Sequence, residues 1–424
     1  MKRIHNGWLI LLVFLLLVAC SVSTTEKADD IIAKLFDEEY EVIVDSYFAD
    51  ELKERLTVDE LREQWETIHQ VHSHLENQQG PKVSHNNQHD IVEYLYDTEQ
   101  GTVKMRMIFD ESKQLTSLNF SDEVIVQMPE GVMEEEVTVG EGNEFELGGT
   151  ITVPSEIEGK IPVVVIVHGS GPNNRDGEML ELTPYRDIAW GLAERGIASI
   201  RYDKRTLIYP EAFMNQDFTW YEETVDDAVL AAEIVSSDDR FDQVYLVGHS
   251  LGGMAGPVIL SESDRFDGFI SLAGSLRSFS DIIMDQFEYL HQTGHVPEEQ
   301  LERIRVEYEK SKKLHELDGG ETVFGLPVTY LNTMEDFRYE AFFEESKKPI
   351  FIVQGEDDYQ VTFKDYQSWQ EALENYEPVT FQLYPGLNHF FVHYEGPHKG
   401  TPNEYGYGGS FSEDVLDDMA RWME

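Results

Sequence analysis

The feature that most constrains the fold is an apolar segment that runs into a serine flanked by glycines, at residues 244–253. Its sequence is Val-Tyr-Leu-Val-Gly-His-Ser-Leu-Gly-Gly. The apolar run predicts a buried strand, and the residues after Ser250 are compatible with a helix. A serine at so sharp a strand-to-helix turn has strained backbone angles, and glycines two positions away let strand and helix approach. The pattern predicts that Ser250 is a nucleophile at the carboxyl edge of a sheet, although the pentapeptide alone also fits an ordinary turn.

The first residues resemble a bacterial secretory signal. Lys2 and Arg3 precede an apolar run over residues 8–19, which is short for a membrane span. Leu-Val-Ala-Cys at residues 17–20 resembles the lipobox of bacterial lipoproteins, which implies that residues 1–19 are removed and that Cys20 is lipidated. We therefore expect an extracytoplasmic, membrane-anchored bacterial lipoprotein with a polar tether over residues 20–27. The alternative is an ordinary cleaved signal followed by an incidental cysteine.

Length and charge limit the number of domains and the partners that the rest of the chain can have. A chain of 424 residues is long enough for two domains, one of them large. It carries 82 acidic and 32 basic side chains, a formal net charge of −50. Such a surface repels nucleic acid and anionic lipid head groups, so we expect no nucleic-acid partner and contact with the membrane only through the lipid. The sequence indicates no oligomeric state.

Residues 28–126 are predicted to form a small α+β domain. Helical periodicity over residues 28–50 and 57–74 is followed by alternating segments at 91–96, 101–109 and 115–120. The arrangement resembles a small lipoprotein domain of unknown function found ahead of some secreted hydrolases, with a cystatin-like or nuclear-transport-factor-like fold. Five histidines in this part lack a convincing set of partner ligands, so we interpret them as solvated side chains and not as a metal site. They are His69, His72, His74, His85 and His89.

Residues 127–424 are predicted to form the second, larger domain. A hairpin over residues 134–153 precedes strands and helices that alternate to residue 423, which indicates an α/β fold with a doubly wound, mostly parallel sheet. The predicted strands are residues 161–167, 197–202, 243–247, 268–273, 348–354 and 379–384, and the predicted helices are residues 183–195, 220–235, 254–260, 363–373 and 411–423.

Glycine-rich residues follow the first long strand of this domain. They are His-Gly-Ser-Gly-Pro at 168–172. The amide of Ser170 in this segment and the amide of Leu251, directly after Ser250, are the predicted donors of an oxyanion hole. A flexible glycine turn is the plainer interpretation of the segment.

An acid and a histidine follow two later strands. Asp357 and Asp358 lie in residues 355–361, and His389 ends the segment 385–389. An open α/β sheet has its ligand crevice at the carboxyl ends of its strands, so these side chains are expected to meet Ser250 there. Serine, acid and histidine then follow one another in the chain order typical of an α/β-hydrolase triad.

From about residue 133 onward the chain resembles the α/β-hydrolase superfamily. Residues 168–176 together with Arg-Tyr-Asp-Lys-Arg-Thr at 201–206 look like a secreted bacterial esterase subgroup that often carries a small N-terminal domain. The resemblance implies hydrolysis of a small acyl ester through an acyl-enzyme, with Ser250, His389 and an acid as the triad and no metal, nucleotide or redox cofactor. The usual acid position of the subgroup corresponds to Asp358, and neighbouring Asp357 remains open.

Residues 275–347 interrupt the alternation where this superfamily inserts a helical cap. We expect two amphipathic helices there, one around residues 282–290 and one over 297–317. An aromatic and apolar patch follows, expected either to face the acyl pocket or only to attach the cap to the core. It comprises Tyr330, Leu331, Met334, Phe337, Tyr339 and Phe343.

Five charged residues near the predicted nucleophile form a separate group. They are Arg175, Asp176, Asp203, Lys204 and Arg205. We interpret them as an ion network that orders loops, with direct substrate contact as the alternative.

Two other functional classes remain open. A peptidase or amidase uses the same triad as an esterase. A non-catalytic surface lipoprotein that binds a ligand is the third class, which a complete triad disfavours.

Overall fold

The chain separates into two compact units, Met1–Gln127 and Met128–Glu424. The computed structural model describes residues 23–71, 75–86, 89–98, 101–110, 112–123, 127–214, 218–318 and 320–424. The predicted signal segment and Cys20 lie outside these ranges. Within them, no helix is both long and apolar enough to cross a membrane.

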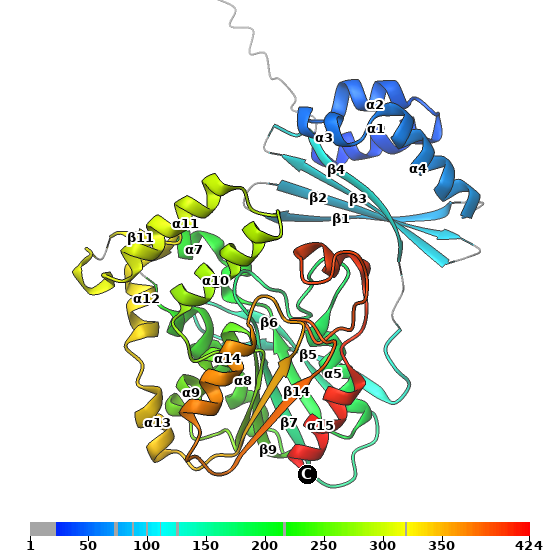
Figure 1. Ribbon diagram of the computed structural model, residues 1–424. Helices are drawn as coiled ribbons and strands as arrows, with labels where there is room; N and C mark the ends of the chain where they lie inside the picture. Colours follow the sequence, from blue (N-terminus) through cyan, green and yellow to red (C-terminus); the bar gives the residue numbers. More distant parts are fainter. Residues whose placement is uncertain are drawn as a thin grey trace, which may run out of the picture. The chain divides into compact units, whose positions relative to one another are not determined.

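The first unit consists of helices followed by an antiparallel sheet. Its sheet has the strand order β1-β2-β3-β4, and alternate residues of β2 are buried against the helices, namely Val92, Tyr94 and Tyr96. The helices are α1 (Thr24–Phe36), α2 (Tyr40–Tyr47), α3 (Asp50–Arg55) and α4 (Val58–Val71), and the strands are β1 (Glu76–Asn86), β2 (His89–Thr98), β3 (Gly101–Asp110) and β4 (Leu115–Glu123) (Figure 1).

Three details of this unit differ from the sequence prediction. The tether predicted to reach residue 27 ends earlier, because the Ser23 hydroxyl and the Glu26 carboxylate form a capping box that starts α1 at Thr24. The helix predicted over residues 28–50 is divided into α1 and α2, since the chain turns at Glu38, whose φ is +59°. Strand β1 was not predicted; it runs through Gly80-Pro81 with shifts in register on either side of Gln79.

The second unit is built on one eight-stranded sheet. Its order is β14-β13-β10-β9-β7-β8-β6-β5, with β5, β6 and β8 paired antiparallel and the remaining neighbours parallel. This is the strand order of an α/β-hydrolase. The strands are β5 (Val132–Val139), β6 (Leu147–Pro154), β7 (Ile161–Val167), β8 (Ala198–Tyr202), β9 (Phe241–His249), β10 (Gly268–Leu272), β13 (Ile350–Gly355) and β14 (Val379–Tyr384) (Figure 1).

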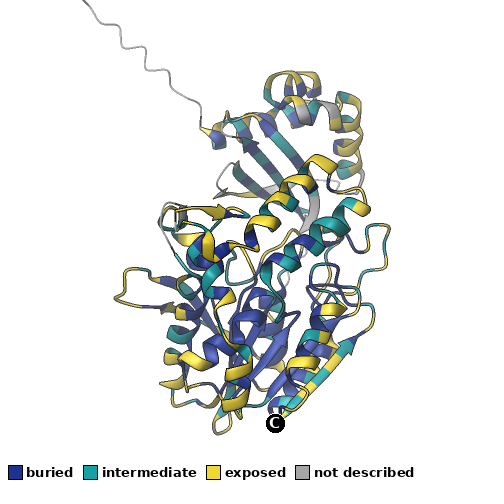
Figure 2. Cartoon of the chain, turned by 60° about the vertical axis from the view of Figure 1, so that its left-hand side comes forward, coloured by how far each residue is buried: buried dark blue, intermediate teal, exposed yellow. Residues whose placement is uncertain are grey.

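Helices cover both faces of this sheet. Along β7, Val163 and Val165 belong to the core under α8 and α9, while Val164 and Ile166 belong to the core under α5 and α15. A strand buried on both faces explains the continuous apolar run in its sequence. The helices and helical turns outside the cap are α5 (Pro184–Glu194), α6 (Arg205–Ile208), α7 (Pro210–Met214), a π-helical turn (Tyr221–Val225), α8 (Asp226–Ser236), α9 (Leu251–Glu262), α14 (Phe363–Ala372), a 3-10 turn (Pro402–Tyr407) and α15 (Glu413–Met423). In Figure 2 the central strands of this sheet are buried, whereas its edge strands β5 and β14 carry exposed residues.

The segment between β10 and β13, where the cap is predicted, is mainly helical. It contains α10 (Phe279–Gln292), α11 (Glu298–Ser311), a 3-10 turn (Leu314–Glu316), the short strands β11 (Thr322–Val323) and β12 (Leu326–Pro327), α12 (Val328–Glu335) and α13 (Tyr339–Glu345). Helices α10 and α11 pack on each other through an apolar cluster that includes Met284, Val296 and Leu301.

Candidate active site

Ser250 lies at the turn between β9 and α9. Its φ of +54° and ψ of −114° are strained for a residue with a side chain. A Cβ on Gly248 would lie 2.2 Å from the carbonyl oxygen of Gly252, and one on Gly252 would lie 2.4 Å from the carbonyl oxygen of Val167. Both glycines are therefore required by close backbone contacts. We call residues 248–252 the nucleophile elbow.

Asp358 and His389 are in contact. The Nδ1 atom of His389 lies 2.7 Å from Oδ2 of Asp358, and both side chains are buried. The carboxylate also accepts hydrogen bonds from the amides of Gln360 and Val361 and from the side chain of Gln354, at 2.8, 3.0 and 3.1 Å. Because these bonds fix the carboxylate, the imidazole ring is held with Nδ1 directed at Oδ2 of Asp358.

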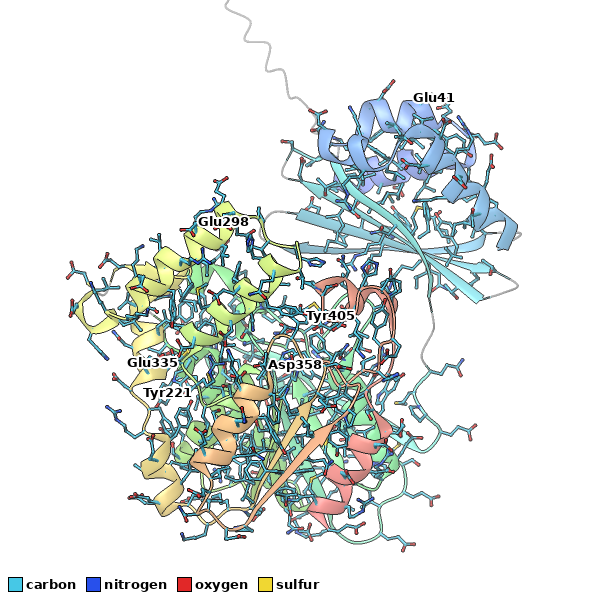
Figure 3. The ribbon with its side chains drawn as sticks, in the orientation of Figure 1. Glu41, Tyr221, Glu298, Glu335, Asp358 and Tyr405 are labelled. Atoms are coloured by element: carbon cyan, nitrogen blue, oxygen red, sulfur yellow. The ribbon has the colours of Figure 1, made fainter. Side chains whose placement is uncertain are left out.

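Asp357 points elsewhere. Its Oδ2 lies 2.8 Å from Nζ of Lys399, which raises the pKa of Lys399 through the hydrogen bond and the charge of the carboxylate. The two neighbouring aspartates therefore have different partners. Figure 3 labels Asp358 beside Tyr405, at the carboxyl ends of the strands.

The segment of residues 169–173, which we call the oxyanion loop, lies against the elbow. A Cβ on Gly169 would be 3.2 Å from Cβ of Ser250. The side-chain amide of Asn173 donates to the carbonyls of Gly169, Ser170 and Gly171 at 3.3, 3.0 and 3.0 Å, so the loop folds around this group. Ser170 and Leu251 both line the cavity described below.

A buried tyrosine and a buried histidine link the loop to His389, and neither was singled out from the sequence. The amide of Gly169 donates to the hydroxyl of Tyr185 at 2.9 Å. The same hydroxyl oxygen lies 3.0 Å from Nδ1 of His249. Nε2 of His249 lies 2.9 Å from the carbonyl oxygen of His389. A carbonyl only accepts, so Nε2 carries the proton and Tyr185 donates to Nδ1. Burial, reinforced by His389, lowers the pKa of His249 to about 3. The local motif contains His249, but no sequence pattern connects it with Tyr185.

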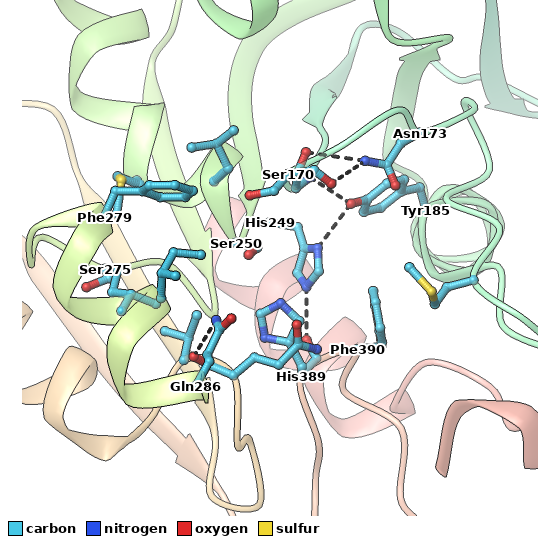
Figure 4. A pocket seen from close by; sticks show the side chains of 18 residues that line it. Ser170, Asn173, Tyr185, His249, Ser250, Ser275, Phe279, Gln286, His389 and Phe390 are labelled. Carbon is cyan, nitrogen blue, oxygen red and sulfur yellow. Dashed lines mark hydrogen bonds between the residues drawn. The ribbon is translucent and has the colours of Figure 1, made fainter. Parts of the chain in front are cut away.

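The cavity beside Ser250 is mainly apolar. It has a volume of about 180 Å³, and Ser250, His389 and Ser170 face it (Figure 4). Among the described residues that line it, the only ionisable side chains besides Tyr185 are the two histidines. The apolar lining consists of Met179, Leu251, Met254, Phe279, Ile282, Ile283, Val361 and Phe390.

The aromatic patch predicted over residues 327–343 does not line this cavity. Its members pack into the core between the sheet and α8, α9 and α14. The expectation that it faces the acyl pocket is therefore wrong, and the alternative, attachment of the cap to the core, describes it. The cap contributes Phe279, Ile282, Ile283 and Gln286 of α10 to the cavity instead.

The five charged residues near the nucleophile form ion pairs. Arg175 binds Asp203 at 2.7 Å, and Arg201 binds Asp176 at 2.9 Å, so both pairs connect the segment after the oxyanion loop with β8. Lys204 binds Glu223 at 2.7 Å, and Arg205 binds Asp227. None of the five charged side chains is among the residues that line the cavity, which favours the loop-ordering interpretation over direct substrate contact.

The described residues contain no group of three or more His, Cys, Asp and Glu side chains that could hold a metal ion. Among the histidines of the first unit, the ring of His69 packs against Trp65 at 4.7 Å between centroids. His72 and His74 lie outside the described residues.

Each of the two units contains a match to a protein family. Residues 190–405 match the model of the prolyl oligopeptidase family, and residues 28–118 match a family described as a protein of unknown function, DUF3887. Esterase EstD of Thermotoga maritima is 30% identical over 384 residues, which cover 88% of this chain and 89% of the relative.

Solved structures with related folds have lower identity. Est1E from Butyrivibrio proteoclasticus is 16% identical with a TM-score of 0.45, over 68% of this chain and 98% of Est1E. A puromycin-hydrolyzing peptidase of Mycobacterium tuberculosis is 17% identical with a TM-score of 0.45, over 80% of this chain and 46% of the peptidase.

Proposed function

This chain belongs to the prolyl oligopeptidase family and is a serine hydrolase of the carboxylesterase type, homologous to an esterase, and from this we propose that Ser250, His389 and Asp358 cleave small, uncharged acyl esters. The observation that carries the proposal is the 2.7 Å contact between Nδ1 of His389 and Oδ2 of Asp358, beside the cavity that Ser250 faces. A buried acid that orients a histidine next to a strained serine is the arrangement a nucleophilic serine requires.

The chemistry follows from these groups. Nε2 of His389 takes the hydroxyl proton while Oγ of Ser250 forms a bond to the ester carbonyl, whose oxygen becomes an oxyanion. The amides of Leu251 and Ser170 stabilise that charge. The imidazolium then protonates the alkoxide as the ester C–O bond breaks, which leaves an acyl group on Ser250. Water repeats the sequence, releases the acid and restores the serine.

The lining of the cavity supports a neutral ester over a peptide. The prolyl oligopeptidase match makes a peptidase or amidase the second candidate. However, the described lining of the cavity offers no carboxylate, lysine or arginine to bind a charged end of a peptide. A p-nitrophenyl ester and a p-nitroanilide with the same short acyl group separate the two: we expect turnover of the ester and no measurable turnover of the anilide, and anilide turnover that Ser250→Ala abolishes would indicate an amidase.

The proposal is tested by active-site labelling. The mature protein should react with a fluorophosphonate in a 1:1 ratio, and Ser250→Ala should abolish both labelling and ester hydrolysis. Ser263→Ala is a matched control, because Ser263 follows α9 and lies outside the cavity lining. A folded wild-type protein that neither reacts nor hydrolyses esters would indicate the third candidate, a non-catalytic binding lipoprotein.

We also propose that Cys20 carries a lipid that anchors the enzyme on the outer side of a bacterial membrane. The apolar run and the Leu-Val-Ala-Cys sequence support this. Cys20→Ala should release the protein or leave an unprocessed precursor, as measured by membrane fractionation and the mass of the N-terminal peptide. Unchanged retention of the variant in the membrane would contradict the lipid anchor.

A further inference from the structure

One peptide unit of the oxyanion loop is held by a buried lysine that does not line the cavity. Nζ of Lys204 donates to the carbonyl oxygen of Gly169 at 2.8 Å. That carbonyl and the N–H of Ser170 belong to the same peptide group. In a trans peptide the C=O and N–H bonds point in opposite directions. A donor that fixes the carbonyl of Gly169 therefore fixes the direction of the Ser170 amide.

The position of Lys204 is itself fixed by buried partners. Its Nζ also lies 2.7 Å from Oε1 of Glu223, which belongs to the π-helical turn before α8, and the two side chains are only 2% and 7% exposed. The second oxygen of Glu223 accepts a hydrogen bond from the hydroxyl of Tyr330 in α12 of the cap. A buried charge pair with these hydrogen bonds has one low-energy arrangement, unlike an exposed lysine with many rotamers.

The charge of Lys204 also affects the amide electronically. An ammonium group bound to a carbonyl oxygen polarises the peptide group, which makes its N–H a stronger donor. Oxyanion donors act mainly by being oriented in advance toward the charge that develops in the transition state.

We propose that Lys204, held by Glu223 and Tyr330, is a positioning residue that directs the Ser170 amide into the oxyanion hole. The inference rests on the proposed function of Ser250. It assigns to one member of the charged group near the nucleophile a role in transition-state stabilisation, although Lys204 itself does not line the cavity. It also links the cap to the oxyanion loop through three side chains.

The experiment replaces the ion pair as a unit, because removing one partner would leave a buried charge unpaired. Lys204→Met/Glu223→Gln removes the donor to Gly169, while the introduced side-chain amide can still accept from Tyr330. The matched control is Arg205→Met/Asp227→Asn, an adjacent buried pair whose side chains bind each other, with Nε of Arg205 3.1 Å from Asp227. Tyr330→Phe, which removes the hydrogen bond to Glu223 but keeps the ion pair, is used if the first variant does not fold.

The readouts separate an oriented amide from general stability. They are kcat and KM on p-nitrophenyl acetate, and the inhibition constant of a trifluoromethyl ketone, whose carbonyl carbon bonds to Oγ of Ser250 and whose oxygen becomes an anion in the oxyanion hole. We expect Lys204→Met/Glu223→Gln to lower kcat by about 10- to 100-fold, somewhat less than deletion of an oxyanion donor. The inhibition constant should rise by a similar factor while KM changes less than about threefold. Tyr330→Phe should give a smaller loss of the same kind.

Other outcomes overturn the inference. If wild type hydrolyses the ester and the folded variant keeps its kcat and inhibition constant within about threefold, Lys204 does not position the amide. If the Arg205→Met/Asp227→Asn control loses as much kcat and inhibitor affinity, Lys204 contributes only to stability. A wild-type enzyme that is inactive and does not bind the ketone would contradict the proposed function itself, which is a distinguishable result.

Discussion

The two segments that carry the proposed oxyanion donors are held in different ways. The nucleophile elbow is fixed mainly by backbone contacts: Gly248 lies close to Gly252, Gly252 lies close to the carbonyl of Val167, and the amide of Leu251 is at the start of α9, where a helix leaves its first N–H groups without helical partners. The oxyanion loop is fixed mainly by side chains. It is held by side chains from distant parts of the chain, among them Tyr185 and Lys204, together with its own Asn173.

This difference has a consequence for mutations. A substitution in the elbow changes backbone packing, so it should affect stability and activity together. A substitution among the side chains around the loop changes the direction of one amide, so it should affect the transition state more than the folded state.

The largest effect is expected at Asp358, the proposed triad acid, whose carboxylate is fixed by neighbouring amides and contacts His389. Asp358→Asn should lower kcat by about 10⁴-fold with the fold intact, because the amide would hold the imidazole of His389 in the wrong tautomer. Asp357→Asn is the matched control; its carboxylate binds Lys399, and we expect a change within about tenfold. Both variants are measured on one ester, with circular dichroism as the check of folding. The reverse ranking would make Asp357 the acid.

A substitution in the nucleophile elbow should affect both stability and activity. Gly252→Ala would place its Cβ 2.4 Å from the carbonyl of Val167, so strand β7 and helix α9 must move apart. We expect destabilisation of about 1–3 kcal/mol and a loss of at least about 10² in kcat/KM, since small displacements of reacting groups are costly. Gly320→Ala, with no atom near its Cβ, is the control. Full activity of Gly252→Ala would contradict the close packing of the elbow.

The buried histidines make stability depend on pH. Burial lowers the pKa of both His168 and His249 to about 3. An unfolded histidine binds a proton below about pH 6.5 whereas these remain neutral, so unfolding takes up protons and stability falls as the pH decreases from 6.5 toward 3. Each contributes up to about 2 kcal/mol between pH 7 and 5.

The comparison variant for this effect is His249→Gln. Its amide can keep one acceptor for Tyr185 and one donor to the carbonyl of His389, but it does not titrate. Urea unfolding at pH 7 and pH 5 should show a smaller loss of stability for the variant than for wild type. An identical pH dependence would mean that His249 is charged in the folded protein.

The smallest effect is expected at Asn173. Asn173→Ala removes hydrogen bonds to three carbonyls of the oxyanion loop, but Lys204 and Tyr185 still hold Gly169. A net loss of about 1 kcal/mol of hydrogen bonding corresponds to a fall of about fivefold in kcat/KM, and we expect little change in melting temperature. Asn174→Ala, which loses bonds only to Glu178, should have no effect. A loss above about 10²-fold in Asn173→Ala would show that Asn173, not Lys204, dominates the loop.

The same difference explains what the sequence could predict. The alternation of strands and helices and the turn at Ser250 are local patterns, and β7, β9 and α9 lie where they were expected. Ser250, Asp358 and His389 were predicted to meet because each follows a strand, and the carboxyl ends of parallel strands lie at one edge of the sheet. In the structure Asp358 contacts His389, and His389 and Ser250 line the same cavity.

The features that were missed depend on contacts between distant residues. Tyr330 and Glu223 are 107 residues apart, and only the folded chain brings them together. The aromatic patch in the cap failed as a pocket prediction because apolar character indicates burial but not which apolar surface is covered. Strand β1 was not predicted because Gly80-Pro81 is locally a turn signal. Its conformation is decided by pairing with β2 across a shifted register.

The most direct test of the account is the covalent intermediate. Wild-type enzyme mixed rapidly with p-nitrophenyl acetate should release about one equivalent of p-nitrophenol before the steady state, and acid quenching followed by peptide mass analysis should locate the acetyl group on Ser250. Asp358→Asn should form the same acetylated peptide much more slowly, and Ser250→Ala should form none. An acetyl group on another residue, or hydrolysis that persists in folded Ser250→Ala, would contradict the account.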